Sequence, residues 1–229
     1  MKIGAGGCSH SSDDYGNPWH YYMGKKLNAE IVSFSSSGAG NEMNIEKIKH
    51  ILENNKLDLF VYQITDPARL IMGINNKIQN GFEHVLLSPN QFNGINYYTF
   101  NPHSNKENLR VIYDKDYDLV DEFMLENVIS SDFNNKIKIF HTLLSINQLC
   151  DMYNVKCVFF SWFVNLQDLS KEVGYSEILK KLNVLDGHVN KFVVTNKIPF
   201  YTETDFHLGS ESQELIYDNF IHPQLINYI

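Results

Sequence analysis

Ser9 is the residue in this sequence best placed to act as a nucleophile. It lies in a polar cluster, residues 7–11 (Gly-Cys-Ser-His-Ser), directly after a short apolar stretch at residues 2–6. A serine on a tight turn after a strand exposes its hydroxyl and its own backbone N–H together, as a nucleophile and an oxyanion donor require. The simpler interpretation is a serine-rich turn without chemistry. The thiol of Cys8 is a second candidate nucleophile. If the side chain of Ser9 faces a cleft, however, that of its neighbour Cys8 should point away from the cleft.

Two further clusters would complete this chemistry. Residues 37–41 combine glycines, which let backbone approach a ligand closely, with Asn41, whose amide stands at the expected start of a helix as its N-cap. Near the C-terminus, Asp205 can hold one ring nitrogen of His207 while the other nitrogen takes a proton from a hydroxyl. Taken alone, the two clusters also fit a plain Gly-rich loop with an Asn cap and a pair of solvated loop residues.

The hydrophobic pattern predicts the elements that bring these clusters together. Alternating strands and helices indicate a parallel sheet with covering helices, and residues 2–6 are expected to be its central strand. Ligands gather at the carboxyl ends of such strands, where all three clusters fall. The expected strands are residues 2–6, 30–34, 57–62 and 155–163, and the expected helices are residues 18–28, 41–52 and 133–153.

The remaining segments have weaker patterns. Residues 66–130 are rich in Asn, aromatic residues and loop signals, and predict an irregular insertion with some helix near residues 116–128. No repeat or linker is evident, so residues 1–229 are expected to form one domain. Further expectations are a short helix at residues 177–182, a helix or a strand at residues 189–198, and an amphipathic helix over residues 208–228 interrupted at Pro223.

The chain order of the three clusters resembles that of the SGNH (GDSL-like) hydrolase family. The resemblance implies a three-layer α/β/α sandwich with a parallel sheet, and ester cleavage by a Ser–His–Asp triad. Matched motif by motif, Ser9 corresponds to the family's nucleophile, Asp205 and His207 to its acid and base, and Gly38 to the glycine whose backbone N–H serves the oxyanion.

One subgroup is most similar. The helix at residues 19–23 (Trp-His-Tyr-Tyr-Met) and the loop at residues 38–41 look most like phage and bacterial members with a Gly-Cys-Ser start. In that subgroup the Asn of the second loop recurs, and this makes Asn41 a third candidate for the oxyanion hole.

The sequence also departs from the family pattern. Cys8 replaces the usual Asp of the first block, and the last block has Asp-x-His in place of Asp-x-x-His, a spacing associated with acetyltransfer relatives. The third block, normally Gly-x-Asn-Asp, reads Gln-Ile-Thr-Asp at residues 63–66, so Gln63 or Thr65 would have to replace the missing oxyanion Asn.

Arg69 follows the third block and is one of only two arginines in the chain. An arginine near the ligand edge of the sheet can clamp a carboxylate or a phosphate. The alternative is a structural salt bridge with Asp66.

Composition excludes several classes of function. The chain has 229 residues, with 27 acidic against 19 basic side chains, which argues against a nucleic-acid binder. The sequence contains no run of 18 apolar residues, so no membrane-spanning helix is expected. The first apolar stretch is too short for a signal peptide, so a cytoplasmic protein is expected. Three cysteines are too few for a disulfide framework. The 26 Asn beside two Arg indicate an AT-rich genome, in line with a phage-encoded protein.

Two other sites are less favoured. Gly4, Gly6 and Gly7 suggest a dinucleotide fingerprint, but the third glycine and the acidic residue after the second strand are lacking. A metal site would draw on His10, Asp13, Asp14, His20 and His207, whose spacing matches no compact ligand motif.

The sequence therefore predicts a serine ester hydrolase that needs no cofactor and acts on a small-molecule or glycan ester. A sugar acetyl ester is the first choice, because exposed aromatic residues and Asn suit sugars. The alternatives are an O-acyltransferase, and a non-catalytic binding or structural protein that retains the fold. The sequence does not define the acyl group or the oligomeric state.

Overall fold

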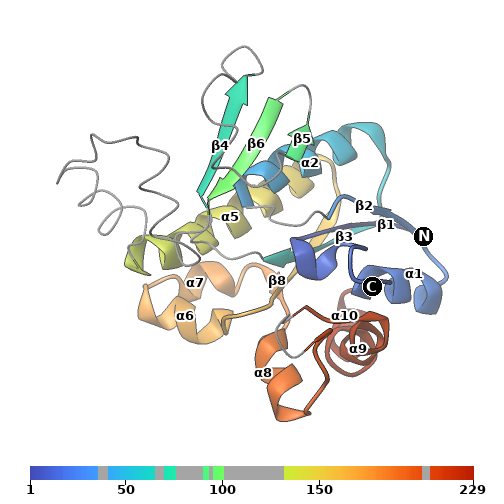
Figure 1. Cartoon of the computed structure of the whole chain (residues 1–229). Helices are drawn as coiled ribbons and strands as arrows, with labels where there is room; N and C mark the ends of the chain where they lie inside the picture. Colours follow the sequence, from blue (N-terminus) through green and yellow to red (C-terminus); the bar gives the residue numbers. More distant parts are fainter. Residues whose placement is uncertain (36–40, 65–69, 76–89, 93–94, 101–131, 203–206) are drawn as a thin grey trace, which may run out of the picture.

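A computed structural model of the chain describes residues 1–35, 41–64, 70–75, 90–92, 95–100, 132–202 and 207–229 (Figure 1). The strands are β1 (Lys2–Gly6), β2 (Glu30–Ser33), β3 (Leu59–Ile64), β4 (Leu70–Asn75), β5 (Asn90–Phe92), β6 (Ile95–Phe100), β7 (Lys156–Ser161) and β8 (Asn183–Val184). The main helices are α1 (Trp19–Leu27), α2 (Asn41–Asn54), α5 (Asp132–Met152), α6 (Leu166–Glu172), α7 (Ser176–Leu179), α8 (Val189–Thr195), α9 (Ser210–Ile216) and α10 (His222–Leu225). Shorter helical segments are η1 (Ser9–Ser11), η4 (Tyr217–Ile221) and η5 (Ile226–Tyr228).

The main sheet has five parallel strands in the order β2-β1-β3-β7-β8. The centre of the sheet is therefore β3, and the expectation that residues 2–6 form the central strand is wrong by one position. The physical reason lies in the side chains: β3 is buried at all six residues, as a strand covered on both faces must be. β1, with its glycines and alanine, lies between β3 and the edge strand β2.

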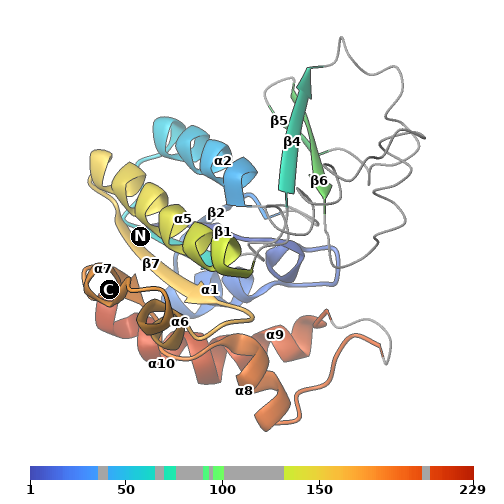
Figure 2. The ribbon, with the colours of Figure 1, turned by 90° about the vertical axis from the view of Figure 1, so that its left-hand side faces the viewer.

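Helices cover both faces of this sheet and make a three-layer α/β/α fold, as expected. One apolar core joins the sheet to α1, α8, α9 and α10, and a second joins it to α2, α5, α6 and α7. Figure 2 shows the sheet between α2 and α5 on one side and α1, α9 and α10 on the other. Among the described helices, none is both long and apolar enough to cross a membrane.

The order of the strands creates a switch point at β1. From β1 the chain passes through α1 to β2 on one side, and then through α2 to β3 on the other side. The two helices therefore lie on opposite faces of the sheet. A crevice at this place is where open parallel sheets bind their ligands.

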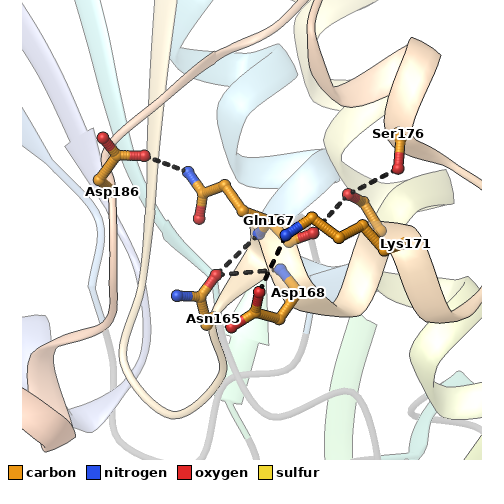
Figure 3. Close-up of polar contacts among 7 residues, drawn as sticks. Asn165, Gln167, Asp168, Lys171, Ser176 and Asp186 are labelled. Atoms are coloured by element: carbon orange, nitrogen blue, oxygen red, sulfur yellow. Dashed lines mark hydrogen bonds and ion pairs between the residues drawn. The ribbon is translucent and has the colours of Figure 1, made fainter.

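The segment of residues 156–172 contains more helix than expected. β7 ends at Ser161, and α6 follows, a helix that the sequence analysis did not predict. Its start is fixed by Asn165, whose side-chain oxygen accepts hydrogen bonds from the backbone N–H groups of Gln167 and Asp168 at 3.0 and 3.1 Å (Figure 3). The Gln167 amide also donates to Asp186 at 2.8 Å, which ties α6 to the segment after β8. The Asn cap was the available signal.

The expected irregular insertion contains regular structure. β4, β6 and β5 form an antiparallel sheet in which, for example, Met72 pairs with Tyr98. Strand β6 is rich in β-branched and aromatic residues, and this propensity outweighs the Asn residues around it. The helix expected near residues 116–128 lies outside the described residues.

The C-terminal segment is helical, but not as one helix. Residues 189–195 form α8, which settles the choice between helix and strand. After α9 the backbone widens into the π-helical segment η4 and continues as α10. Pro223 lies in the first turn of α10, directly after the π-helical segment, and does not end the helical path.

Phe160 of β7 tests the core that carries the site. It is fully buried and meets Trp19 edge to face, with ring centroids 5.0 Å apart. We expect Phe160→Ala to lower the free energy of unfolding by about 3–5 kcal/mol, because a large cavity opens between the sheet and α1. Urea titration measures this change. The matched variant Phe133→Ala, at a side chain that is 60% exposed, should change it by less than about 0.5 kcal/mol. Equal losses in both variants would contradict the assigned core.

Candidate functional site

A tight turn follows β1 and carries the predicted nucleophile. The backbone N–H of Ser11 donates to the carbonyl of Cys8 at 2.8 Å, and this bond closes the turn of η1, of which Ser9 is the first residue. The side chain of Ser9 lies outside the described part of the structure. Gly7 is required, because a Cβ there would lie within 3 Å of the Ser11 hydroxyl and of the Gln63 amide oxygen.

The turn is held on one face of the sheet by Gln63. The Ser11 hydroxyl donates to Gln63 Oε1 at 2.5 Å and accepts from Trp19 Nε1 at 2.7 Å. Gln63 Nε2 donates to Cys8 Sγ at 3.3 Å and to the carbonyl of Ile64 at 3.3 Å. The side chains of Ser11, Trp19, Gln63 and Cys8 are all fully buried. Polar groups without water must find partners inside the protein, so this network fixes the turn rigidly.

His20 supports the same turn. Its Nε2 lies 2.9 Å from the carbonyl oxygen of Ser11, and since a carbonyl only accepts, Nε2 carries the proton of this bond. Burial lowers the pKa of His20, against the smaller opposing effects of the bond to Ser11 and of the Asp13 charge. A neutral imidazole with one fixed tautomer follows.

Asn44 and Tyr62 hold the turn on the other face. Asn44 Nδ2 donates to the carbonyl of Gly7 at 3.2 Å and to the Tyr62 hydroxyl at 2.9 Å. The Tyr62 hydroxyl donates in turn to Asn41 Oδ1 at 3.1 Å. Asn41 is buried and is the first residue of α2, not the capping residue before it. This relay connects the β1 turn to the start of α2.

The C-terminal segment docks on the loop that follows β1. Gln213 Nε2 donates to the carbonyl of His10 at 3.0 Å, and the backbone N–H of Asn17 donates to the Ser210 hydroxyl at 2.9 Å. The carbonyl of His207 accepts from the backbone N–H of Tyr201 at 2.7 Å. These bonds bring His207 from the far end of the chain to the carboxyl end of β1.

The ring of His207 contacts two other rings. It stacks on Tyr15 with centroids 4.0 Å apart and an interplanar angle of 7°, and the ring of His10 lies 4.8 Å from it, tilted by 30°. His10 stacks in turn on the buried Trp162 at 4.2 Å, and the half-exposed Phe163 meets the edge of His10 at 5.6 Å. His207 is thus a near neighbour of the residue that follows Ser9.

A groove lies beside the turn, between α1 and the edge strand β2. Its volume is about 760 Å³, within the range of ligand pockets. Hydroxyl, carboxylate, amide, imidazole and ammonium groups line it together with a smaller number of apolar residues. The lining residues are Ser11, Ser12, Asp13, Asn17, Pro18, His20, Tyr21, Gly24, Lys25, Ala29, Ile31, Ser33, Phe34 and Ser35.

Other predicted site residues lie outside the described residues, namely Gly38, Thr65, Arg69 and Asp205. Of the residues considered for a metal site, none belongs to a group of three or more His, Cys, Asp or Glu side chains that could hold an ion within the described part of the chain.

Asn44 and Tyr62 are site residues that the sequence analysis did not single out. A signal for Asn44 was present: it shares a helix face with the buried Ile48, Ile51 and Leu52, and a polar residue on an apolar face needs a partner. Tyr62 reads as a core residue in a buried strand, and its hydroxyl has no signature in the sequence.

Ser11→Ala tests the network on the α1 face. The substitution leaves the Trp19 indole N–H and the Gln63 amide oxygen buried without their common partner, so we expect a loss of about 2–4 kcal/mol in the free energy of unfolding. The matched variant is Ser170→Ala, a buried serine whose hydroxyl donates to a carbonyl of its own helix at 2.8 Å. It should cost about 1 kcal/mol. Urea unfolding of both proteins gives the comparison, and a Ser11→Ala loss no larger than that of Ser170→Ala would count against the network.

Comparison with known proteins supports the fold. No protein-family model matches the chain, and no curated protein matches its sequence. The structure is similar to that of TesA, with a TM-score of 0.58 and 11% identity over the whole of both chains. It is also similar to the psychrotrophic esterase EstA from Pseudoalteromonas sp., with a TM-score of 0.54 and 11% identity over 99% of this chain and 97% of the other. A GDSL-like lipase from Bacteroides thetaiotaomicron gives a TM-score of 0.50 and 12% identity over 100% and 89% of the two chains.

Proposed function

We propose that the protein is a serine ester hydrolase in which Ser9 attacks the ester, His207 is the base, and Asp205 orients His207. The observation that carries the proposal is the position of the His207 ring, 4.8 Å from the ring of His10, at the turn where Ser9 follows β1. The imidazole of a residue near the C-terminus thereby lies beside the turn that carries Ser9, near the switch point of the sheet, which supports the assignment. The esterase and lipase named above share this fold.

The proposed reaction has two steps. His207 takes the proton of the Ser9 hydroxyl as its oxygen attacks the ester carbonyl carbon, and then returns that proton to the departing alcohol. This step leaves an acyl group on Ser9. Water attacks the acyl carbonyl with His207 again as the base, and the carboxylic acid leaves as Ser9 recovers its proton.

The negative charge on the carbonyl oxygen needs hydrogen-bond donors. We assign this role to the backbone N–H groups of Ser9 and Gly38 and to the side chain of Asn41. Asn41 Oδ1 accepts from the Tyr62 hydroxyl, and Nδ2 is the donor that we assign to the oxyanion.

The third block contributes in another way. The Gln63 amide is fully buried and engaged with Cys8, Ser11 and Ile64, so we assign it to holding the turn. Thr65 and Arg69 remain candidates for substrate binding.

The groove supports an O-acetyl ester of a carbohydrate as the substrate. Its lining mixes hydrogen-bonding groups of both kinds, and Tyr21 offers an aromatic ring that is 46% exposed. The hydroxyls of a sugar can bind the hydrogen-bonding groups, and the apolar faces of its ring can pack on Tyr21. A fatty acyl chain would instead require mainly apolar walls. We place the sugar in this groove and the acetyl group at Ser9, with residues 66–130 completing the pocket.

Two other functions are each favoured by one feature of the sequence. The absent oxyanion Asn of the third block favours a non-catalytic binding protein that retains the fold. The Asp-x-His spacing favours an O-acyltransferase, in which a second alcohol replaces water. Product analysis with an added sugar acceptor separates transfer from hydrolysis.

Ser9→Ala tests the nucleophile. EstA has been solved inhibited by monoethylphosphonate, and a fluorophosphonate probe uses the same class of chemistry. We expect the probe to label the wild-type protein and not the variant, and p-nitrophenyl acetate hydrolysis to fall by roughly 10⁴-fold or more.

Cys8→Ala is the matched control, because it removes the neighbouring thiol and should retain labelling at Ser9. Labelling that survives Ser9→Ala but disappears in Cys8→Ala would transfer the role to the thiol. A folded wild-type protein that neither reacts with the probe nor hydrolyses the ester would favour the non-catalytic alternative.

Tyr21→Ala tests the groove as the sugar site. We expect KM for an acetylated sugar to rise about 5- to 10-fold, equivalent to the loss of about 1 kcal/mol of contact, with p-nitrophenyl acetate kinetics unchanged. Tyr153→Ala, at an exposed tyrosine after α5, is the control and should change neither substrate's kinetics. A Tyr21→Ala protein with wild-type KM for the sugar ester would remove the sugar from this groove.

A further inference from the structure

The ring of His207 belongs to a series of four rings in contact, which we call the stack although the His10–His207 pair is tilted by 30°. Trp162, His10, His207 and Tyr15 follow one another with centroid distances of 4.2, 4.8 and 4.0 Å. Trp162 and His10 are 3% and 6% exposed, so the inner end of the stack is fixed in the core. Tyr201 meets the edge of Tyr15 at 5.5 Å, and its backbone N–H binds the His207 carbonyl.

We propose that Tyr15 and His10 are positioning residues that hold the plane of the His207 ring for proton transfer. The proposal rests on the proposed function, in which His207 is the base. A hydrogen bond to one ring nitrogen fixes the direction of that nitrogen, but the ring can still turn about the bond. The terminal torsion of histidine is broad by itself. Tyr15, stacked on the His207 ring, and His10, tilted by 30° at 4.8 Å, restrict this remaining freedom.

The stack also acts on charge. His207 becomes positive as it takes the proton from the serine, and the electron-rich face of Tyr15 lies 4.0 Å away and almost parallel to it. An aromatic face attracts such a cation. This attraction is stronger in the transition state than in the ground state, so its loss lowers kcat and leaves KM nearly unchanged.

Tyr15 is the position to change, because it is half-buried at the outer end of the stack and its loss leaves the core intact. Tyr15→Leu removes the ring, and Tyr15→Phe keeps the ring without its hydroxyl. With p-nitrophenyl acetate we expect kcat of Tyr15→Leu to fall by about 10- to 100-fold with KM within about 2-fold. Tyr15→Phe should stay within about 3-fold of wild type in both constants. Both variants should unfold at the wild-type temperature.

Two kinetic results would overturn the positioning role of Tyr15. Wild-type kcat in Tyr15→Leu, or a change confined to KM, would overturn the proposal. Equal losses in Tyr15→Phe and Tyr15→Leu would also overturn it, since they would assign the effect to the hydroxyl.

Proton NMR tests the stack without reference to activity. Ring currents from Tyr15 shift the ring protons of His207 upfield, and the His207→Gln variant identifies their signals by their absence. We expect this shift in the wild type and in Tyr15→Phe, and its loss in Tyr15→Leu. No such shift in the wild type would overturn the positioning role. The expected shifts in a protein that does not hydrolyse esters would refute the proposed function and leave the stack itself established.

Discussion

The turn after β1 is held from both faces of the sheet, and the rest of the site depends on this constraint. Tyr62 and Gln63 are successive residues of β3, so their side chains point to opposite faces. Gln63 reaches Ser11 and Cys8 on the α1 side, and Tyr62 meets Asn44, which binds Gly7, on the α2 side. One strand thereby fixes the backbone that carries Ser9.

The fold was largely predictable, because it follows from local patterns. The apolar run at residues 57–62 and the helical spacing after Asn41 both lie where β3 and α2 are found. The order of the strands was less predictable, since it depends on pairing between distant segments. Nothing in residues 2–6 themselves says whether they lie at the centre of the sheet or one place away. β6 was hidden for a different reason: its strand-forming residues stand among loop signals.

The sequence suggests candidate site residues by their types, but it does not predict their contacts. Asp-x-His and Gly-Cys-Ser can be recognised along the chain, and His207 does lie at the end of β1 beside His10. The partner of a buried amide cannot be recognised in this way. Gln63 stands where a donor to the oxyanion was expected, yet its reach to Ser11 depends on the exact approach of β1 and β3. Tyr15 gave no signal at all, because its role depends on where the C-terminal segment docks.

Two different physical means therefore position the two ends of the proposed reaction. The turn of Ser9 is fixed by hydrogen bonds among fully buried groups, so any change that loosens it also destabilises the fold. We propose that His207 owes its orientation to ring contacts, among them the stacked Tyr15, which is only half-buried. Such a contact can be lost with little cost to the fold. The position of the proposed nucleophile is thus coupled to stability, whereas the position of the proposed base is a separate property that evolution or design can alter on its own.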